Sequence, residues 1–375
     1  MKNTLNDVPL PRGSKASLPH GSLPEVFSMY LRDLIGQTGG VLGPIGLQFV
    51  ARQKQEKKYF NLTNMDPLNE DHHEEAPGLV YKYKGKIKKN GEITYYGRAL
   101  WTVTRFCASY CRFCTRGREV GYMGSAQLNE NATMAQKAYL SDEDLDKVEA
   151  YLDTHPEINE IIVSGGDPLT TPEAYFSEII NRLSRRQAAG NLDIVRIGTR
   201  FPIHNPIGIK DWHYKQVGRL KNPYLMLHIN HSAELTPQTL KVLERFRHES
   251  GAIEMSQTVL LKGVNDSVDT LYWLFTKLAK EGIRPYYVYQ NDDVCWAKHF
   301  TVPLPKAIKI WQKLRPRLSG VAATARFVID IAKGYGKIAL PEGDAWIVDY
   351  SKGLKDFKGK HFDLSEVNSL NLVAK

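Results

Sequence analysis

Residues 104–116 read TRFCASYCRFCTR and include Cys107, Cys111 and Cys114, three of the four cysteines in this 375-residue chain. Three thiolates in a C-x3-C-x2-C spacing can bind three corners of an iron–sulfur cube and leave the fourth iron without a protein ligand. An open coordination position is a place for chemistry, as it is in catalytic zinc sites. Buried apolar cysteines, or a disulfide plus a spare thiol, are disfavoured by such clustering in a cysteine-poor chain. We therefore expect a [4Fe–4S] cluster on these three cysteines.

The sequence around this stretch alternates between short apolar segments and helical patterns from residue 98 onward. Short buried strands separated by helices indicate parallel βαβ units, and six such units precede the last expected strand. We therefore expect an α/β fold built on a partial, open (βα)6 barrel, with functional residues at the carboxyl ends of its strands. The expected strands cover residues 98–104, 160–164, 193–198, 224–229, 254–261, 285–289 and 325–331.

The rest of the chain forms smaller sections around this barrel. Helical spacing over residues 24–34 and 47–58 predicts an N-terminal, mainly helical extension. Alternate lysines over residues 82–89, followed by Asn90-Gly91, predict an inserted β-hairpin that closes with a type I′ turn. The expected sections are the extension (1–80), the hairpin (81–97), the barrel (98–340) and a C-terminal tail (341–375).

Composition and charge limit the class of protein. The chain is 42% hydrophobic and 24% charged, and no apolar run is long enough to span a membrane. The polar N-terminus lacks the apolar core of a signal peptide, and a cluster that needs reduced thiols favours the cytoplasm. The net charge of +9 permits contact with nucleic acid without establishing it. The hairpin lysines are most simply interpreted as a solvated face, with docking to an acidic partner as the alternative.

Polar residues follow several of the expected strands. Gly165 and Gly166 allow a ligand to approach the backbone closely, and Asp167 can accept a hydrogen bond from an ammonium group. A tight turn is the alternative interpretation of this motif. Several polar residues on one barrel rim indicate a binding site. Those at or near the other strand ends are Arg196, Arg200, His228, Asn230, His231, Gln257 and Asn265.

A second informative stretch, FVIDIAKGYGK, covers residues 327–337. Gly334 and Gly336 form a bend that carries Lys337 beyond a strand containing Asp330. A solvated lysine in a glycine loop is the simplest interpretation. A lysine desolvated at a barrel mouth can instead bind pyridoxal phosphate (PLP) covalently.

Taken together, these motifs resemble the lysine 2,3-aminomutase family of radical S-adenosylmethionine (SAM) and PLP-dependent enzymes. The resemblance extends over about residues 60–340 in the family's order, and it implies a radical SAM barrel. The matching pieces are DPLNED and PGL before the barrel, C-x3-C-x2-C-T-R, SGGD, VRIG-x-R-x-P, H-x-N-H, VLL-x-GVND, YQ-x-D and FV-x-D…G-x-G-K.

The resemblance also implies roles for individual residues. Lys337 would bind PLP covalently, Arg200 would bind the PLP phosphate, and Tyr95 would contact PLP. Arg116 would pair with the substrate α-carboxylate. Asp292 and Asp330 would hold a distal ammonium group, which a distal carboxylate could not replace. The residues that would bind SAM are Gly165, Gly166, Asp167, His228, Asn230 and Gln257.

The implied activity moves the α-amino group of L-lysine, or of a similar basic amino acid, from C2 to C3 to give β-lysine. Arginine and ornithine would also suit two carboxylates. A protein reductant of flavodoxin or ferredoxin type would supply an electron, and a homo-oligomer is compatible with the sequence. Neither a membrane nor a nucleic acid is expected as a partner.

Other functions remain open at the level of sequence. One is the production of (R)-β-lysine for modification of elongation factor P, and another is a radical SAM reaction on RNA or protein. An RNA-modifying enzyme would have no need of Lys337. A structural or redox-sensing cluster would leave the convergence of Asp292, Asp330 and Lys337 unexplained. Phe113 stands where relatives commonly carry histidine, and the sequence offers no role for it.

Overall fold

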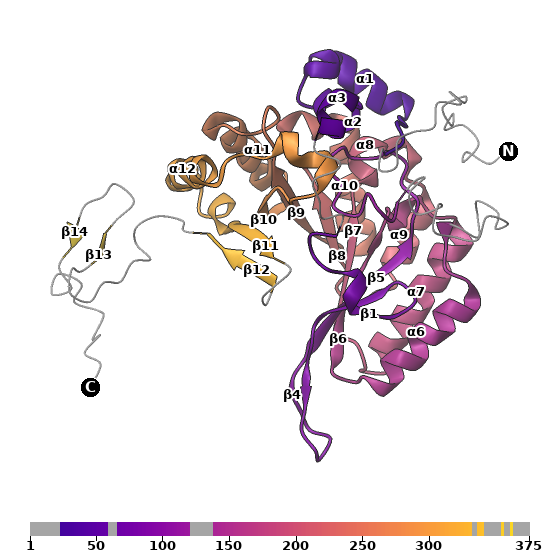
Figure 1. Cartoon of the computed structure of the whole chain (residues 1–375). Coiled ribbons are helices and arrows are strands. Elements are labelled where there is room, and N and C mark those ends of the chain that lie inside the picture. Colours follow the sequence, from indigo (N-terminus) through magenta and orange to yellow (C-terminus); the bar gives the residue numbers. More distant parts are fainter. Residues whose placement is uncertain are drawn as a thin grey trace.

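One ten-stranded sheet organises the protein (Figure 1). The structure is a computed structural model that describes residues 23–58, 66–120, 138–331, 336–340, 354–355 and 361–362. The sheet has the order β1-β2-β5-β6-β7-β8-β9-β10-β11-β12. Its strands are β1 (Glu74–Ala76), β2 (Leu79–Tyr83), β5 (Gly97–Thr104), β6 (Ile158–Gly165), β7 (Ile194–Thr199), β8 (Tyr224–His228), β9 (Ile253–Leu260), β10 (Arg284–Gln290), β11 (Arg326–Ile331) and β12 (Gly336–Ala339).

The central strands are parallel. Each strand from β5 to β11 pairs in parallel with the next, whereas β1, β2 and β12 join the two sides of the sheet antiparallel. The sheet is open, because β1 and β12 each pair with a single strand. Helix-containing connections join consecutive strands from β5 to β11, and this confirms the partial, open barrel expected from the sequence.

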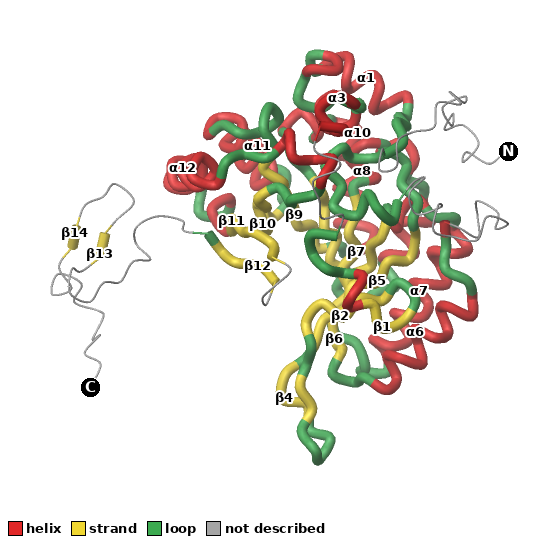
Figure 2. The backbone as a smooth tube through the Cα atoms, viewed as in Figure 1, coloured by secondary structure: helices red, strands yellow, loops and turns green. Residues whose placement is uncertain are grey.

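The longer helices lie on the outer side of the curved sheet (Figure 2). Ser141, Thr236 and Ser267 cap three of them by accepting a hydrogen bond from the backbone N–H three residues ahead. None of the described helices is long and apolar enough to cross a membrane. The longer helices are α6 (Asp142–Thr154), α7 (Glu173–Ala188), α9 (Asp211–Val217), α10 (Pro237–Ser250), α11 (Val268–Lys280) and α12 (Leu304–Leu314).

Short elements complete the described part of the chain. The two-residue strands β13 (Leu354–Lys355) and β14 (His361–Phe362) pair antiparallel. The short helices are α8 (Phe201–His204), η2 (Gly40–Leu42), η4 (Asp71–His73), η5 (Pro168–Thr170), η6 (Pro206–Gly208), η7 (Ser232–Glu234), η8 (Cys295–Phe300), η9 (Arg315–Arg317) and η10 (Ala322–Thr324).

The N-terminal extension contains three helices: α1 (Met29–Gln37), α2 (Gly46–Phe49) and α3 (Gln53–Lys58). The single helix expected over residues 47–58 is therefore wrong. Val50 has an extended backbone, with ψ near 129°, and it separates α2 from α3. Such a conformation suits a β-branched side chain, whose rotamers are restricted in a helix.

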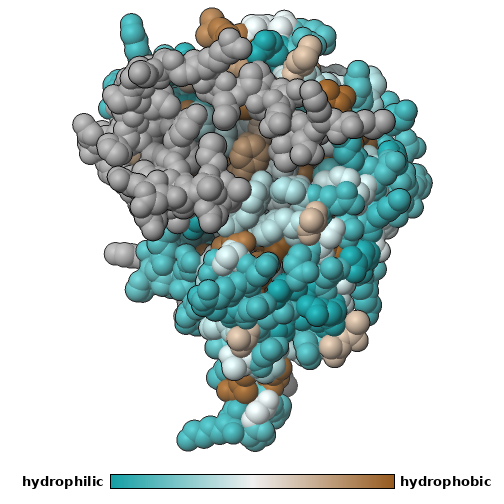
Figure 3. All heavy atoms as spheres, turned by 90° about the vertical axis from the view of Figure 1, so that its right-hand side faces the viewer, coloured by the Kyte–Doolittle hydropathy of each residue, from teal (hydrophilic) through white to brown (hydrophobic). Residues whose placement is uncertain are grey.

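The expected hairpin projects from the body of the protein (Figures 1 and 3), with β3 (Lys86–Ile87) paired to β4 (Ile93–Tyr95). Its turn differs from the expected type I′, which requires positive φ at both central residues. Gly91 has φ +84°, and its N–H donates to the Lys88 carbonyl, so it is the last residue of the turn. Asn90 is not among the described residues with positive φ.

Arg112, inside the cysteine stretch, fastens the extension to the barrel. Its side chain is 1% exposed, and its Nη1 donates to the Leu23 and Pro24 carbonyls at 2.8 and 3.3 Å. Its Nε donates to Glu56 Oε1 at 2.9 Å, and its Nη2 bonds the other oxygen of Glu56. The described part of the extension therefore packs against the cysteines.

We predict that Arg112→Met destabilises folding by about 3–5 kcal/mol, because it leaves the buried Glu56 carboxylate without its charge partner. Denaturant unfolding followed by circular dichroism measures this change. Lys147→Met, which breaks an exposed ion pair with Glu143, is the control and should cost at most about 0.5 kcal/mol. The double variant Arg112→Met/Glu56→Met should recover much of the loss. A loss of stability as small as that of the control would contradict the role of Arg112 in fastening the extension to the barrel.

Candidate active site

The cysteine stretch leaves the end of β5 and packs against the two glycines at the end of β6. A Cβ atom on Gly165 would lie 2.2 Å from the Thr104 carbonyl oxygen, and one on Gly166 would lie 2.0 Å from that of Phe106. The Gly166 N–H donates to the Thr104 carbonyl at 2.6 Å, and the Asp167 N–H donates to the Phe106 carbonyl at 2.8 Å. Glycine is therefore required at residues 165 and 166, where the end of β6 passes the start of the cysteine stretch, because only a residue without a side chain allows this approach.

The three cysteines lie together in a half-buried apolar setting. Burial, with the charges of neighbouring groups, raises the pKa of Cys107 well above its ordinary value and that of Cys114 to about 12. Thiols in such a setting ionise when a cation binds them. No three described His, Cys, Asp or Glu side chains could hold a single metal ion. A four-iron cube makes a different demand, because each thiolate binds its own corner. The donor set therefore fits a cluster.

Arg200 lies beside these cysteines. Its Nη1 is 2.9 Å from Cys111 Sγ, and its Nη2 donates to Gln48 Oε1 at 2.5 Å and to Glu234 Oε1 at 3.1 Å. Its guanidinium also stacks over the Phe49 ring at 4.5 Å. The binding of a PLP phosphate by Arg200 stays a prediction that these contacts do not support, because the buried guanidinium is already bonded on the cysteine side of the site.

Asp167 connects the end of β6 to the end of β7. Its Oδ1 accepts from Thr199 Oγ1 and the Leu169 N–H, and its Oδ2 accepts from the N–H groups of Arg200 and Phe201. Burial raises its pKa to about 6, although these hydrogen bonds oppose the rise. The carboxylate is fully used within the protein, so its expected bond to the SAM amino group stays a prediction. Only the bond from the Leu169 N–H is local to the turn, and the other three tie Asp167 to the end of β7.

The other residues expected to bind SAM lie at the end of β8 or within β9. His228 and Gln257 are paired in the sheet register, whereas Asn230 is buried and bonds Gln48 and the Val259 N–H. Burial and the charge of Arg200 lower the pKa of His228 to about 3. His228 Nε2 has no hydrogen-bond partner in the described structure. A buried polar atom without a partner fits a bound ligand, so His228 meets this test for SAM better than Asn230 does.

Phe113 acquires a role that the sequence did not reveal. Its ring centroid lies 5.4 Å from that of His228 and 6.1 Å from that of Phe300, with the second contact edge-on. It belongs to the apolar cluster against which the three cysteines pack. Phe113 therefore contributes an apolar surface that contacts His228 and belongs to the cluster that packs against the cysteines.

Arg116, two residues beyond the last cysteine, is held by Glu70. Its Nε and Nη2 donate to the two oxygens of Glu70 at 2.8 and 2.9 Å, and its Nη1 lies 3.3 Å from Ser164 Oγ. Glu70 also bonds Lys82, at the base of the hairpin. Glu70 belongs to the DPLNED motif, so the sequence marked this residue as part of a family motif. Its pairing with Arg116 could not be inferred, because the two residues lie far apart in the sequence.

Asp292 is connected to the cysteine stretch through Thr115. The Thr115 hydroxyl donates to Asp292 Oδ2 at 2.6 Å. Burial raises the pKa of Asp292 to about 6, and the nearby carboxylate of Asp330 contributes to the rise while Thr115 and Lys337 oppose it. The structure therefore brings Asp292, Asp330 and Lys337 into one electrostatic neighbourhood, as the sequence motifs predicted.

Lys337 of β12 lies directly across from Asp330 of β11 in the sheet. Its Nζ is 2.9 and 2.8 Å from the two oxygens of Asp330, and 4.8 Å from the centre of the Tyr289 ring. Tyr289 was missed, although its place near the end of an expected strand was visible in the sequence. Tyr95 is 64% exposed on the projecting hairpin, so the structure does not bring it to Lys337. The inserted hairpin accounts for this misplacement.

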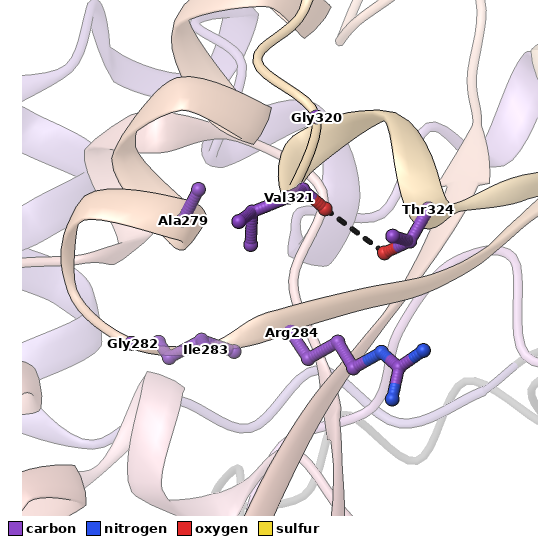
Figure 4. Close-up of a pocket in the computed structure, with 7 residues that line it drawn as sticks. All are labelled: Ala279, Gly282, Ile283, Arg284, Gly320, Val321 and Thr324. Carbon is purple, nitrogen blue, oxygen red and sulfur yellow. Dashed lines mark hydrogen bonds between the residues drawn. The ribbon is translucent and has the colours of Figure 1, made fainter.

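A pocket of about 370 Å³ lies elsewhere, between the end of α11, the start of β10 and the turn before β11 (Figure 4). Its lining is mainly apolar and includes Ile283 and Val321, and the Val321 carbonyl accepts from Thr324 Oγ1 at 2.9 Å. It borders the amino end of β10, whereas the residues above gather at carboxyl ends. It is therefore distinct from the candidate active site.

Comparisons with known proteins agree with this arrangement. No protein-family model matches the chain. A putative L-lysine 2,3-aminomutase of Treponema pallidum is 32% identical over 328 residues, which cover 87% of this chain and 84% of that protein. The L-lysine 2,3-aminomutase of Bacillus subtilis is 33% identical over 299 residues, which cover 79% of this chain and 56% of that protein. The match therefore spans little more than half the length of the Bacillus protein.

Among solved structures, a radical SAM methyltransferase from Sphaerobacter thermophilus gives a TM-score of 0.44 at 18% identity, covering 69% of this chain and 79% of that chain. This likeness is too remote to define the fold, which rests on the strand order of the chain itself. The extent of the Treponema match decides the family. The chain belongs to the lysine 2,3-aminomutase family.

Proposed function

We propose that this chain moves the α-amino group of L-lysine from C2 to C3 and so produces β-lysine. The observation that carries the proposal is the arrangement of charge around Lys337. The Lys337 amine lies on the carboxylate of Asp330, with a second, partly buried carboxylate, Asp292, close by. Thr115 joins Asp292 to the segment that carries Arg116. Family membership supports the same reaction.

A substrate with both a carboxylate and a distal ammonium group suits these charges. The guanidinium of Arg116 has N–H groups that Glu70 does not use, and they can bind the α-carboxylate. Asp292 and Asp330 can bind the distal ammonium. Lys337 itself supports this assignment, because its alkylammonium already pairs with Asp330. If Lys337 held PLP, the Asp330 carboxylate would be available to the ammonium of the substrate.

The proposed cofactors are the [4Fe–4S] cluster, SAM and PLP. When bound, the reduced cluster and SAM supply a radical that removes hydrogen, and PLP carries the nitrogen that migrates. Cys107, Cys111 and Cys114 would hold the cluster, and Lys337 would hold PLP. Gly165, Gly166, Asp167, His228, Asn230 and Gln257 would form the SAM pocket, with His228 best supported by its unpaired Nε2.

The protein would also exclude water from the site. Phe113 and Phe300 pack beside the cysteines, and Trp296 Nε1 donates to the Cys114 carbonyl at 3.1 Å. Such an apolar surround protects a reactive radical from side reactions. We further propose a cytoplasmic location and a flavodoxin- or ferredoxin-type reductant. Production of (R)-β-lysine for elongation factor P would use the same residues and would differ in product stereochemistry.

Covalent PLP binding by Lys337 is directly testable. We predict that borohydride fixes PLP to the wild-type protein and that Lys337→Ala abolishes this fixation, because the nitrogen that forms the link is removed. Mass spectrometry of tryptic peptides locates the modified lysine. Lys306→Ala is the matched control, because Lys306 also pairs with a single carboxylate, that of Asp266, at 2.6 Å. Fixation that persists in Lys337→Ala would refute the assignment.

The carboxylate pair gives a second prediction. Asp330→Asn should lower kcat/KM for L-lysine by at least about tenfold, since loss of one buried charge contact costs on the order of 1.4 kcal/mol or more. The absorbance of the cluster should remain. Asp293→Asn is the control, because its side chain is 70% exposed beside Asp292. Equal turnover in both variants would exclude Asp330 from substrate binding.

The same carboxylates predict how activity depends on pH. Because burial raises the pKa of Asp292 to about 6, this group loses its negative charge as the pH falls through that value. Its attraction for the substrate ammonium is then lost, so kcat/KM should be high above about pH 6 and decline below it. In Asp292→Asn kcat/KM should be low throughout and its decline should be shallower, because of these two site carboxylates only Asp167, whose pKa is also about 6, still loses its charge in this range. A wild-type kcat/KM that stays constant from about pH 8 to pH 5 would contradict the role of Asp292.

A further inference from the structure

We propose that Glu70 is a positioning residue that orients Arg116 so that one edge of its guanidinium faces the substrate carboxylate. The inference rests on the proposed function and adds a residue to it. The side chain of Glu70 is 3% exposed, and it accepts from Arg116 through both of its oxygens. Two parallel N–H···O bonds fix the plane of a guanidinium as well as its position.

The geometry leaves a defined part of Arg116 available. A guanidinium has five N–H groups, and Glu70 uses one on Nε and one on Nη2. The remaining N–H groups are on Nη1 and on the other side of Nη2. Among the residues that the structure describes, Nη1 makes one long contact, 3.3 Å, with Ser164 Oγ at the end of β6. A second carboxylate can therefore bind the outer edge while Glu70 keeps the inner one.

The charges favour a permanent support over a group that the substrate displaces. Although burial opposes ionisation, the charges of Arg116 and Lys82 hold the pKa of Glu70 well below its ordinary range. The carboxylate thus stays ionised beside Arg116 and Lys82, and it can hold Arg116 while the substrate binds. If the substrate displaced Glu70 from Arg116, a buried carboxylate would lose its two-bond charge partner at a substantial cost.

The test compares ligands with and without a carboxylate. L-Lysine and 1,5-diaminopentane are titrated calorimetrically into the protein loaded with its cluster and PLP, without SAM, so that no turnover occurs. Wild type should bind lysine more tightly than the diamine. In Glu70→Gln this preference should fall by about tenfold or more, while affinity for the diamine changes less than about threefold. Glu70→Asp should restore part of the preference. Glu75→Gln is the control, because Glu75 pairs with Lys84 on the surface.

Each outcome decides the question. Equal weakening of both ligands, or an unchanged preference in Glu70→Gln, would overturn the proposal in favour of a purely structural Glu70. Tighter lysine binding in the variant would mean that Glu70 competes with the substrate, and would also overturn it. If Glu70→Gln does not fold, Arg116→Lys keeps the charge but lacks the second edge, so retention of the preference there would contradict the proposal. Wild-type protein that binds no lysine would instead refute the proposed function itself.

Discussion

The close approach of the end of β6 to the end of β5 is the contact on which the site depends. Gly165 and Gly166 pass so near the backbone of Thr104 and Phe106 that no side chain fits between them. This contact directs the cysteine stretch over the carboxyl ends of the parallel strands, where ligands bind in open α/β sheets. The same stretch continues through Thr115, which bonds Asp292, and through Arg116, which bonds Glu70. One short segment therefore connects the proposed cluster ligands with the residues proposed to bind both ends of the substrate.

Charged groups in the site are balanced in opposite-charge pairs, and these pairs define which ligand charges the site can accept. Arg116 is matched by Glu70, and Lys337 is matched by Asp330. Binding of PLP to Lys337 would remove one cation and leave carboxylates that attract an ammonium, which selects a basic amino acid. On the other side, Arg112 and Arg200 connect the extension to the cysteines through Glu56 and Gln48. The N-terminal extension thus contributes contacts to the candidate active site.

The sequence predicted the barrel well because apolar segments and helix caps are local signals. It also predicted the neighbourhood of Asp292, Asp330 and Lys337, since parallel β10 and β11 end side by side and the chain turns back after β11 to place Lys337 opposite Asp330. The sequence-based predictions failed where contacts between distant parts of the chain determine the position of a side chain. The contacts of Arg200 with Gln48 and Glu234 join distant parts of the chain. Likewise, Tyr95 sits on an inserted hairpin whose direction depends on tertiary structure, and the type I′ turn was wrong because Asn90-Gly91 also suits a turn that ends at the glycine.

The central claim is a reaction, and the most direct measurement identifies its product. The reduced protein, supplied anaerobically with SAM and PLP, is incubated separately with L-lysine, L-arginine, L-ornithine and L-glutamate. Chiral chromatography with mass spectrometry then identifies any isomer. The account predicts that lysine gives β-lysine of one handedness and that glutamate, with its distal carboxylate, gives none. Absence of a β-amino isomer from lysine, or a preference for glutamate, would contradict it.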